Sequence, residues 1–252
     1  MLNTPRRLAF FLPNIFTALN MACGFFSIIL GWKGDFYPAA MLLVLGAIFD
    51  SVDGRVARMT HTQSAFGEQF DSISDVVTFG VAPAFLVYNK FFFDLGRIGL
   101  ITSFVFLLCG ALRLARFNAN IEKVSSAFFQ GLPIPSGALA LVGLTLFSIE
   151  FPEINNLRPL MIAYVLLFAF LMISNIPFNS FKKSEWVRRH KKRVLFLIFL
   201  IMILTASYEH VMIGLIINVY VIASLIYFLK NKGALKDMFQ WKSEDDEEAG
   251  EV

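Results

Sequence analysis

The sequence has few cysteines, histidines and charged residues for its length. Only 2 of its 252 residues are cysteine and 3 are histidine. Cys23 and Cys109 have no partner cysteine or histidine at metal-ligand spacing, so both are expected to be small core residues and a disulfide-rich scaffold is excluded. Charged residues make up 16% of the chain, against about 25% in a typical soluble domain. This scarcity of charge, beside a hydrophobic fraction of 57%, excludes a disordered chain and an ordinary soluble enzyme.

Apolar residues instead fall in long blocks, with a mean hydropathy of +0.65 and 29 phenylalanines. A helix needs about 20 mostly apolar residues to cross a bilayer, and about eight segments approach that length. They are residues 8–32, 37–59, 73–93, 98–117, 134–151, 160–177, 194–208 and 211–229. We therefore expect an all-α polytopic membrane protein, in which Pro13 and Asn14 interrupt the first segment early and the last two segments form a tight hairpin.

The distribution of positive charge predicts the orientation of these segments. With both termini on the cytoplasmic side, 18 of the 22 basic residues fall in cytoplasmic segments and four fall outside. Basic residues concentrate in the cytoplasmic loops of membrane proteins, so this asymmetry favours both the number of spans and the orientation. We expect an integral protein of a bacterial inner membrane whose termini and functional site face the cytoplasm.

Composition divides the chain into four parts. Residues 1–178 form one transmembrane unit of six spans, and residues 179–193 form a strongly basic cytoplasmic loop. Residues 194–230 form an additional transmembrane hairpin, and residues 231–252 form an acidic cytoplasmic tail. The basic loop is expected to lie on anionic headgroups, with specific binding of a lipid or a partner as the alternative.

Four aspartates carry the functional signal. Asp50 and Asp53 are three residues apart and share a helix face, and Asp71 and Asp75 are four apart and share a face of the next helix. The connection between the two pairs is short, so the helices are expected to be antiparallel neighbours whose four carboxylates meet near the cytoplasmic surface. The alternative is a set of helix caps and solvated acids, which does not explain the paired spacing.

Carboxylates inside a membrane segment cost several kcal/mol unless they are paired or bind a ligand. Four together repel one another, and hard divalent cations such as Mg²⁺ or Mn²⁺ would neutralise them through oxygen ligands. Two such ions about 4 Å apart could clamp a diphosphate. Gly54 and Ala57 on the same face leave room for a substrate, and Arg58 could meet a phosphate.

These residues form the pattern Asp-x2-Asp-Gly-x2-Ala-Arg-x8-Gly-x3-Asp-x3-Asp, in which the sequence resembles the CDP-alcohol phosphotransferase family. Every fixed position is present: Asp50, Asp53, Gly54, Ala57, Arg58, Gly67, Asp71 and Asp75. The resemblance implies a six-helix bundle, a homodimer, and an enzyme that displaces CMP from a CDP-linked lipid or alcohol. It further implies that the four aspartates hold two divalent metals, that Asp75 is also the general base, and that Gly54, Ala57, Arg58 and Gly67 border the CDP group.

A polar stripe opens the first span. Asn14, Thr17 and Asn20 recur at every third residue in a segment similar to the family's first span. They are expected to face the nucleotide or the diphosphate. The alternative is that they cap the helix and form helix–helix hydrogen bonds.

A second segment narrows the choice of acceptor substrate. Residues 113–118, followed by Gly-Leu-Pro-Ile-Pro-Ser at 131–136, resemble the phosphatidylserine synthase branch of the family. Arg113 and Arg116 end the fourth span and, together with Asn118, are expected to bind the acceptor through its carboxylate or a lipid phosphate. The alternative for the arginines is anchoring on the positive side of the membrane. The Gly-Leu-Pro turn is expected either to shape the pocket wall or only to begin the fifth span.

The resemblance therefore implies transfer of the phosphatidyl group from CDP-diacylglycerol to L-serine. The expected partners are these two substrates, membrane lipids and a second copy of the chain, with no nucleic acid. Glycerol 3-phosphate or an inositol phosphate is the alternative acceptor. A divalent-cation transporter is the alternative from another functional class, although its acids would be spread through both leaflets.

Overall fold

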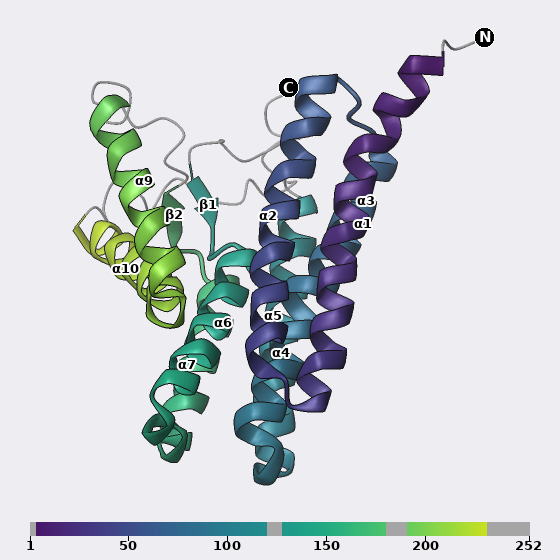
Figure 1. Ribbon diagram of the computed structural model, residues 1–252. Helices are drawn as coiled ribbons and strands as arrows, with labels where there is room; N and C mark the ends of the chain where they lie inside the picture. Colours follow the sequence, from purple (N-terminus) through teal and green to yellow (C-terminus); the bar gives the residue numbers. More distant parts are fainter. Residues whose placement is uncertain (1–3, 120–127, 180–190, 231–252) are drawn as a thin grey trace, which may run out of the picture.

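The computed structural model describes residues 4–119, 128–179 and 191–230. Nearly all of these residues are helical, as predicted (Figure 1). The α-helices are α1 (Thr4–Lys33), α2 (Phe36–Thr60), α3 (Ala65–Asp75), α4 (Ala82–Val87), α5 (Arg97–Ala119), α6 (Ile134–Glu150), α7 (Arg158–Ile173), α9 (Lys191–Ser207) and α10 (Glu209–Lys230). Two three-residue strands that the sequence did not predict, β1 (Phe128–Gln130) and β2 (Pro177–Asn179), pair antiparallel.

Within the described residues, each predicted span coincides with an apolar helical segment. Five of these segments are long and apolar enough to cross a membrane by length and composition. Helices α6, α7 and α9 are shorter, at 17, 16 and 17 residues. At 1.5 Å per residue they rise about 25 Å, slightly less than the roughly 30 Å of a hydrocarbon core. The bilayer accommodates such mismatch by local thinning.

The first helix corrects one expectation. Pro13 lies inside α1, and the helix continues through Pro13 and Asn14 without a break. The third span is more irregular than predicted, because π-helical turns at Val76–Val81 and Tyr88–Phe92 and a 3₁₀ turn at Phe93–Leu95 continue α3 and α4. The first π-helical turn begins directly after Asp75.

Three helices cross closely at Thr78, next to the acidic residues. A Cβ atom at Gly24 of α1 would lie 2.7 Å from the Thr78 Cα, and one at Gly46 of α2 would lie 2.9 Å from its Cγ2. The Thr78 hydroxyl donates to the carbonyl of Asn20 at 2.9 Å. Only glycine allows this approach, and the crossing fixes the third span against α1 and α2.

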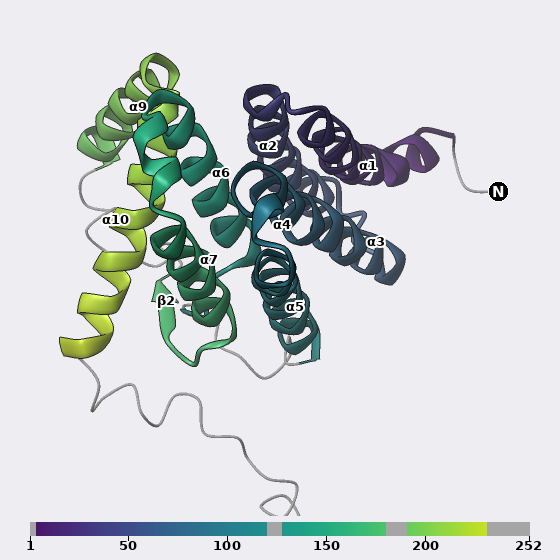
Figure 2. The ribbon, with the colours of Figure 1, turned by 90° about the horizontal axis from the view of Figure 1, so that it is seen from below.

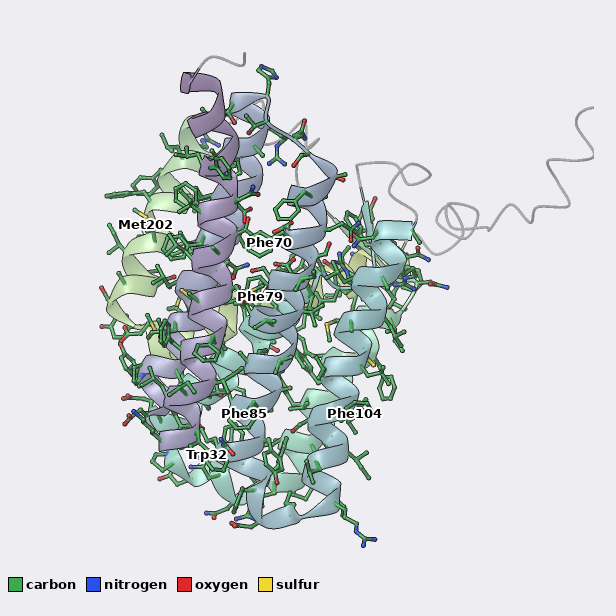
Figure 3. All side chains as sticks on the ribbon, turned by 90° about the vertical axis from the view of Figure 1, so that its right-hand side faces the viewer. Trp32, Phe70, Phe79, Phe85, Phe104 and Met202 are labelled. Carbon is green, nitrogen blue, oxygen red and sulfur yellow. The ribbon has the colours of Figure 1, made fainter. Side chains whose placement is uncertain are left out.

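The interior is filled mainly by aromatic and aliphatic side chains. Phe79 is fully buried between the helices, whereas Phe104 and Met202 lie on the outside and are 59% and 58% exposed (Figure 3). Trp32 and Phe85 stack with ring centroids 6.1 Å apart near the lower end of Figure 3. Large exposed apolar side chains are what a lipid solvent permits.

Helices α9 and α10 form the predicted hairpin, turning at Tyr208. They lie beyond α6 and α7 on the side opposite α1 (Figures 1 and 2). Helix α10 packs on α6, and α9 packs on α10. The hairpin is therefore attached to the six-span unit mainly through α10.

Candidate active site

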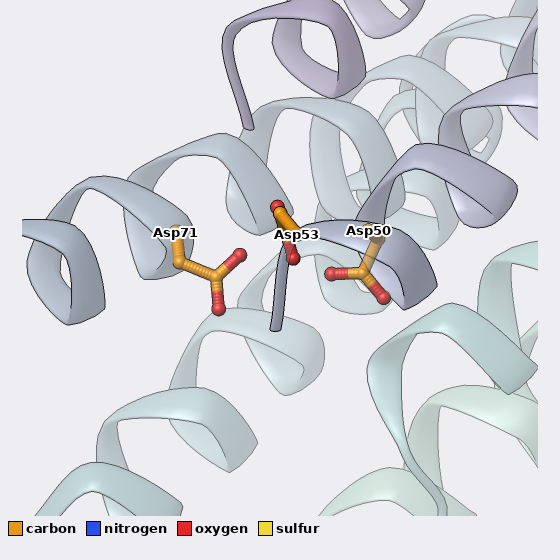
Figure 4. A group of neighbouring side chains, drawn as sticks. All are labelled: Asp50, Asp53 and Asp71. Atoms are coloured by element: carbon orange, nitrogen blue, oxygen red, sulfur yellow. The ribbon is translucent and has the colours of Figure 1, made fainter. Parts of the chain in front are cut away.

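Three of the four aspartates meet between two helices. Asp50 and Asp53 project from α2 and Asp71 from α3, and one carboxylate oxygen of each lies within 4.8 Å of the others. Figure 4 shows the three carboxylates side by side, with Asp53 between the other two. Asp75 follows Asp71 by one helical turn, at the end of α3. The predicted meeting of carboxylates from α2 and α3 is thus observed for Asp50, Asp53 and Asp71.

A short, well-capped turn produces this meeting. Helix α2 ends where His61 adopts a left-handed conformation with φ of 53°, and its backbone N–H donates to the carbonyl of Ala57. Three residues later Ser64 caps α3, which begins at Ala65, and the Ser64 hydroxyl accepts from the backbone N–H of Gly67 at 3.1 Å. Serine at this position satisfies an otherwise unpaired amide of the first helical turn. The two caps reverse the direction of the chain, and α3 then packs against α1.

Helix α1 supplies hydrogen bonds to the two most buried acids. The Thr17 hydroxyl donates to Asp53 Oδ2 at 2.8 Å, and the Asn20 amide donates to Asp75 Oδ1 at 3.4 Å. Asp53 and Asp75 are only 4% and 9% exposed. The carboxylates are therefore held in place by neutral donors that leave their negative charge uncompensated.

This donor set fits a divalent cation. No ion pair compensates the four carboxylates among the described residues, and Asp71 Oδ1 is buried without a hydrogen-bond partner there. Several carboxylate oxygens held this close repel one another unless a cation lies between them. Hard cations such as Mg²⁺ and Mn²⁺ prefer oxygen ligands of this kind. The cluster can therefore hold a divalent metal.

A cavity of about 280 Å³ opens beside the acids. Most of the residues predicted to contact a CDP group or a metal line it: Asn14, Thr17, Asp53, Gly54, Ala57, Arg58, Gly67 and Asp71. A Cβ atom at Gly54 would lie 3.4 Å from Arg58 Nη1, and one at Gly67 would lie 3.3 Å from the Ser64 hydroxyl. Because glycine has no side chain, both positions leave the adjoining cavity space to a ligand.

Other predicted site residues lie outside this lining. Asp50 and Asp75 are not among the residues that line the cavity, and the amide of fully buried Asn20 donates to Asp75. The three polar residues of α1 thus contact different parts of the site. The helix–helix hydrogen bond of the alternative is present, because Thr17 bonds to Asp53 of α2. Thr17 and Asn14 also line the cavity.

The three predicted acceptor residues differ in their surroundings. Arg113 is buried, 6% exposed, and its Cζ lies 5.3 Å from the centre of the Phe117 ring. Arg116 donates hydrogen bonds to several protein oxygens at the end of α7. The Asn118 amide donates to the Ser72 hydroxyl at 2.9 Å, which ties the end of α5 to α3.

Part of the cavity wall was not predicted from the sequence. Thr62, Gln63 and Ser64 of the turn contribute to it, as does Glu68 of α3. Ser64 carried a usable signal, because a serine just before an expected helix start is a typical N-cap. The other three positions can be assigned to the cavity only from the three-dimensional arrangement of α1, α2 and α3.

Comparisons with known proteins agree with this geometry. The family model described as CDP-alcohol phosphatidyltransferase matches residues 10–174. A CDP-diacylglycerol–serine O-phosphatidyltransferase of Helicobacter pylori strain J99 is 37% identical over 231 residues, which cover 88% of this chain and 96% of that protein. Enzymes of the same name from Methanocaldococcus jannaschii and Bacillus subtilis are 42% and 33% identical, over 68% and 69% of this chain and 75% and 92% of their own lengths.

Proposed function

Because the chain belongs to the CDP-alcohol phosphatidyltransferase family, we propose that it transfers the phosphatidyl group of CDP-diacylglycerol to the hydroxyl of L-serine. The products are phosphatidylserine and CMP. The observation that carries the proposal is the meeting of the aspartates of α2 and α3 beside a cavity lined by the remaining motif residues. The names of the similar enzymes support serine as the acceptor.

The cavity is the proposed site for the CDP group. Arg58 and the small residues Gly54, Ala57 and Gly67 line it, so a diphosphate can approach the backbone of both helices. Asp50, Asp53, Asp71 and Asp75 would hold divalent metal, which when bound would supply positive charge to the diphosphate and to the CMP leaving group. Phosphoryl transfer depends chiefly on such positioning and charge stabilisation.

Asp75 is the proposed general base. It is buried behind the cluster, and its Oδ1 accepts from the Asn20 amide. The carboxylate takes the proton from the serine hydroxyl as the serine oxygen attacks the phosphorus of the phosphatidyl group. The bond between that phosphorus and the oxygen of CMP breaks, and CMP leaves with the electron pair. Arg113, buried near the end of α5, would bind the anionic part of the acceptor.

The placement of the acids argues against the transporter alternative. Asp50 and Asp53 lie in the last three turns of α2, and Asp71 and Asp75 lie in the last two turns of the short helix α3 that follows. A conduction path would instead carry polar groups through both leaflets. The acids gather at one end of the bundle, as a reaction with a headgroup at one membrane surface requires.

The test is an acceptor assay with the purified full chain. Release of CMP from CDP-diacylglycerol is measured with L-serine, glycerol 3-phosphate or an inositol phosphate in turn, and the lipid product is identified. We expect release with serine, loss of activity in EDTA, and recovery with Mg²⁺ or Mn²⁺. Asp71→Asn serves as the matched inactive variant. Release with glycerol 3-phosphate and none with serine would show that the proposed acceptor is wrong.

Orientation and assembly are also part of the proposal. A single cysteine at His61 of the turn between α2 and α3, with Cys23 and Cys109 replaced by serine, reports which side of the membrane the site faces. We expect a membrane-impermeant maleimide to label it in inverted vesicles and not in intact cells. Cross-linking of the full chain in membranes tests the expected homodimer.

A further inference from the structure

The guanidinium of Arg116 is engaged by protein oxygens to an unusual degree. Nη1 and Nη2 donate five hydrogen bonds of 3.0 to 3.3 Å. The acceptors lie where β1 meets the end of α7: the carbonyls of Gln130, Met172, Ile173 and Ser174 and the side chain of Asn175. The last carbonyls of a helix have no partner within the helix and carry partial negative charge, which a cation stabilises.

The Gly-Leu-Pro turn is seated on the same junction. Gly131 has φ of 76°, and a Cβ there would lie 2.9 Å from both Arg116 Nη2 and the Ser174 carbonyl. Its N–H donates to the carbonyl of Ile176 at 3.0 Å, and that of Leu132 donates to Leu171 at 3.0 Å. Arg116 therefore joins three segments that are far apart in the sequence: the end of α5, the turn before α6 and the end of α7.

The guanidinium of Arg113, one helical turn earlier, is instead incompletely hydrogen-bonded. Its residue is 6% exposed, and its Nε has no hydrogen-bond partner in the part of the chain that the structure describes. A buried, incompletely bonded guanidinium is costly unless a ligand completes its hydrogen bonds.

We propose that the two arginines have different tasks. Arg113 binds an anionic oxygen group, either the carboxylate of the acceptor or a phosphate of the lipid. Arg116 is a positioning residue, which clamps the end of α5 to the Gly131 turn and the end of α7 and so fixes Arg113. The proposal rests on the proposed function and departs from the sequence-based expectation that both arginines contact the acceptor.

Lysine and glutamine substitutions separate charge from hydrogen-bonding shape. One ammonium cannot reach five acceptors arranged around a planar guanidinium. At position 116 we therefore expect Arg116→Lys and Arg116→Gln to raise the KM for serine alike, by roughly tenfold, with the KM for CDP-diacylglycerol unchanged. At position 113 charge itself matters, so Arg113→Lys should retain part of the affinity that Arg113→Gln loses, a loss of roughly 10- to 100-fold.

Two further variants keep the test decisive if the Arg116 variants fold poorly. Asn175→Ala removes one acceptor of Arg116 without changing any charge, and should raise the KM for serine about threefold, as loss of one ordinary hydrogen bond would. Arg158→Gln is the matched control, because this arginine pairs with Asp94 on an exposed surface. It should leave both KM values as in the wild type.

Three results would overturn the proposal. A normal KM for serine in Arg116→Lys, with a large increase in Arg116→Gln, would make Arg116 a charged ligand. Lower thermal stability with unchanged kinetic constants in Asn175→Ala and both Arg116 variants would make the contacts merely structural. Unchanged KM values for both substrates in the Arg113 variants would show that Arg113 binds neither anion, whereas an increase in the KM for serine alone or for CDP-diacylglycerol alone would identify which of the two it binds. If the wild type used another acceptor, serine would be the wrong acceptor in the proposed function. The same variants, assayed with the acceptor that is used, would still test whether Arg116 positions Arg113.

Discussion

Helices α6 and α9 are equally long and both apolar, yet the protein uses them in opposite ways. Each has 17 residues. Ten residues of α6 are buried, whereas none of the residues of α9 whose side chains are described is. One helix lies within the bundle beside the unit that carries the site, and the other faces outward on the hairpin (Figure 2). Apolar composition therefore identifies the solvent of a segment without indicating which segments pack together.

Small residues account for the difference. Helix α6 carries Gly137, Ala138, Ala140 and Gly143, whereas the middle of α9 consists of leucine, isoleucine, phenylalanine and methionine. Lipid is as apolar as these large side chains, so burying them against another helix gains little in a membrane. Small residues let helix backbones approach and gain van der Waals contact. Helix α10 has one such residue at its crossing with α6, Gly214, which meets Gly143.

The largest expected difference between the two regions is catalytic. Asp75→Asn in the packed unit removes the proposed base and should lower kcat by about 10²- to 10⁴-fold, the usual contribution of a general base. The amide is nearly isosteric, so the variant should fold and elute as the wild type does. CMP release and thermal unfolding in detergent measure the two properties.

Met202→Ala on α9 is the matched control for that experiment. Its side chain is 58% exposed on the outer helix, so the substitution should alter neither kcat nor folding. Near-normal turnover in Asp75→Asn would remove Asp75 from its proposed role. A large loss of kcat in Met202→Ala would contradict the division between a packed catalytic unit and an outward-facing helix.

The crossing of α6 and α10 gives a smaller, asymmetric prediction. A Cβ at Gly143 would overlap the Gly214 backbone, whereas a Cβ at Gly214 would have its nearest neighbour 3.4 Å away, an ordinary contact. Gly143→Ala should therefore destabilise the protein by about 1–3 kcal/mol, as overpacking does. Gly214→Ala should change the stability by less than about 0.5 kcal/mol. Equal shifts in unfolding temperature for the two variants would contradict this geometry.

Local spacing made much of the site predictable. Asp50 and Asp53, and likewise Asp71 and Asp75, share helix faces because side chains three or four residues apart lie together on a helix. The short connection between the pairs then leaves a reversal of the chain as the simplest outcome, which the structure has, although α3 packs on α1 rather than on α2 (Figure 1). The presence of the helices could also be predicted from local sequence, since long apolar blocks in a bilayer must satisfy their backbone hydrogen bonds internally.

Non-local contacts account for what the sequence did not predict. At about 100° per residue, Asn20 lies roughly 120° around α1 from Asn14, so one stripe reaches both the cavity and Asp75. Arg116 resembles Arg113 in sequence, but its partner Ile173 is 57 residues away. The spacing of the two arginines does not reveal that α7 ends beside one of them.

The smallest expected effect on stability comes from the contact between Tyr37 and the first residues of α10. The Tyr37 hydroxyl of α2 donates to Glu209 Oε1 of α10 at 3.0 Å, and its ring stacks on His210 with centroids 5.3 Å apart. Tyr37 is 39% exposed, and water replaces an exposed hydrogen bond at little cost. Tyr37→Phe removes the hydroxyl and keeps the stacked ring, so the unfolding temperature should fall by no more than about 1–2 °C. Tyr37→Ala, which also removes the ring, should lower it further, and activity should be unchanged in both. A fall in Tyr37→Phe as large as that in Gly143→Ala would mean that this exposed contact, rather than the glycine crossing, holds the hairpin to the bundle.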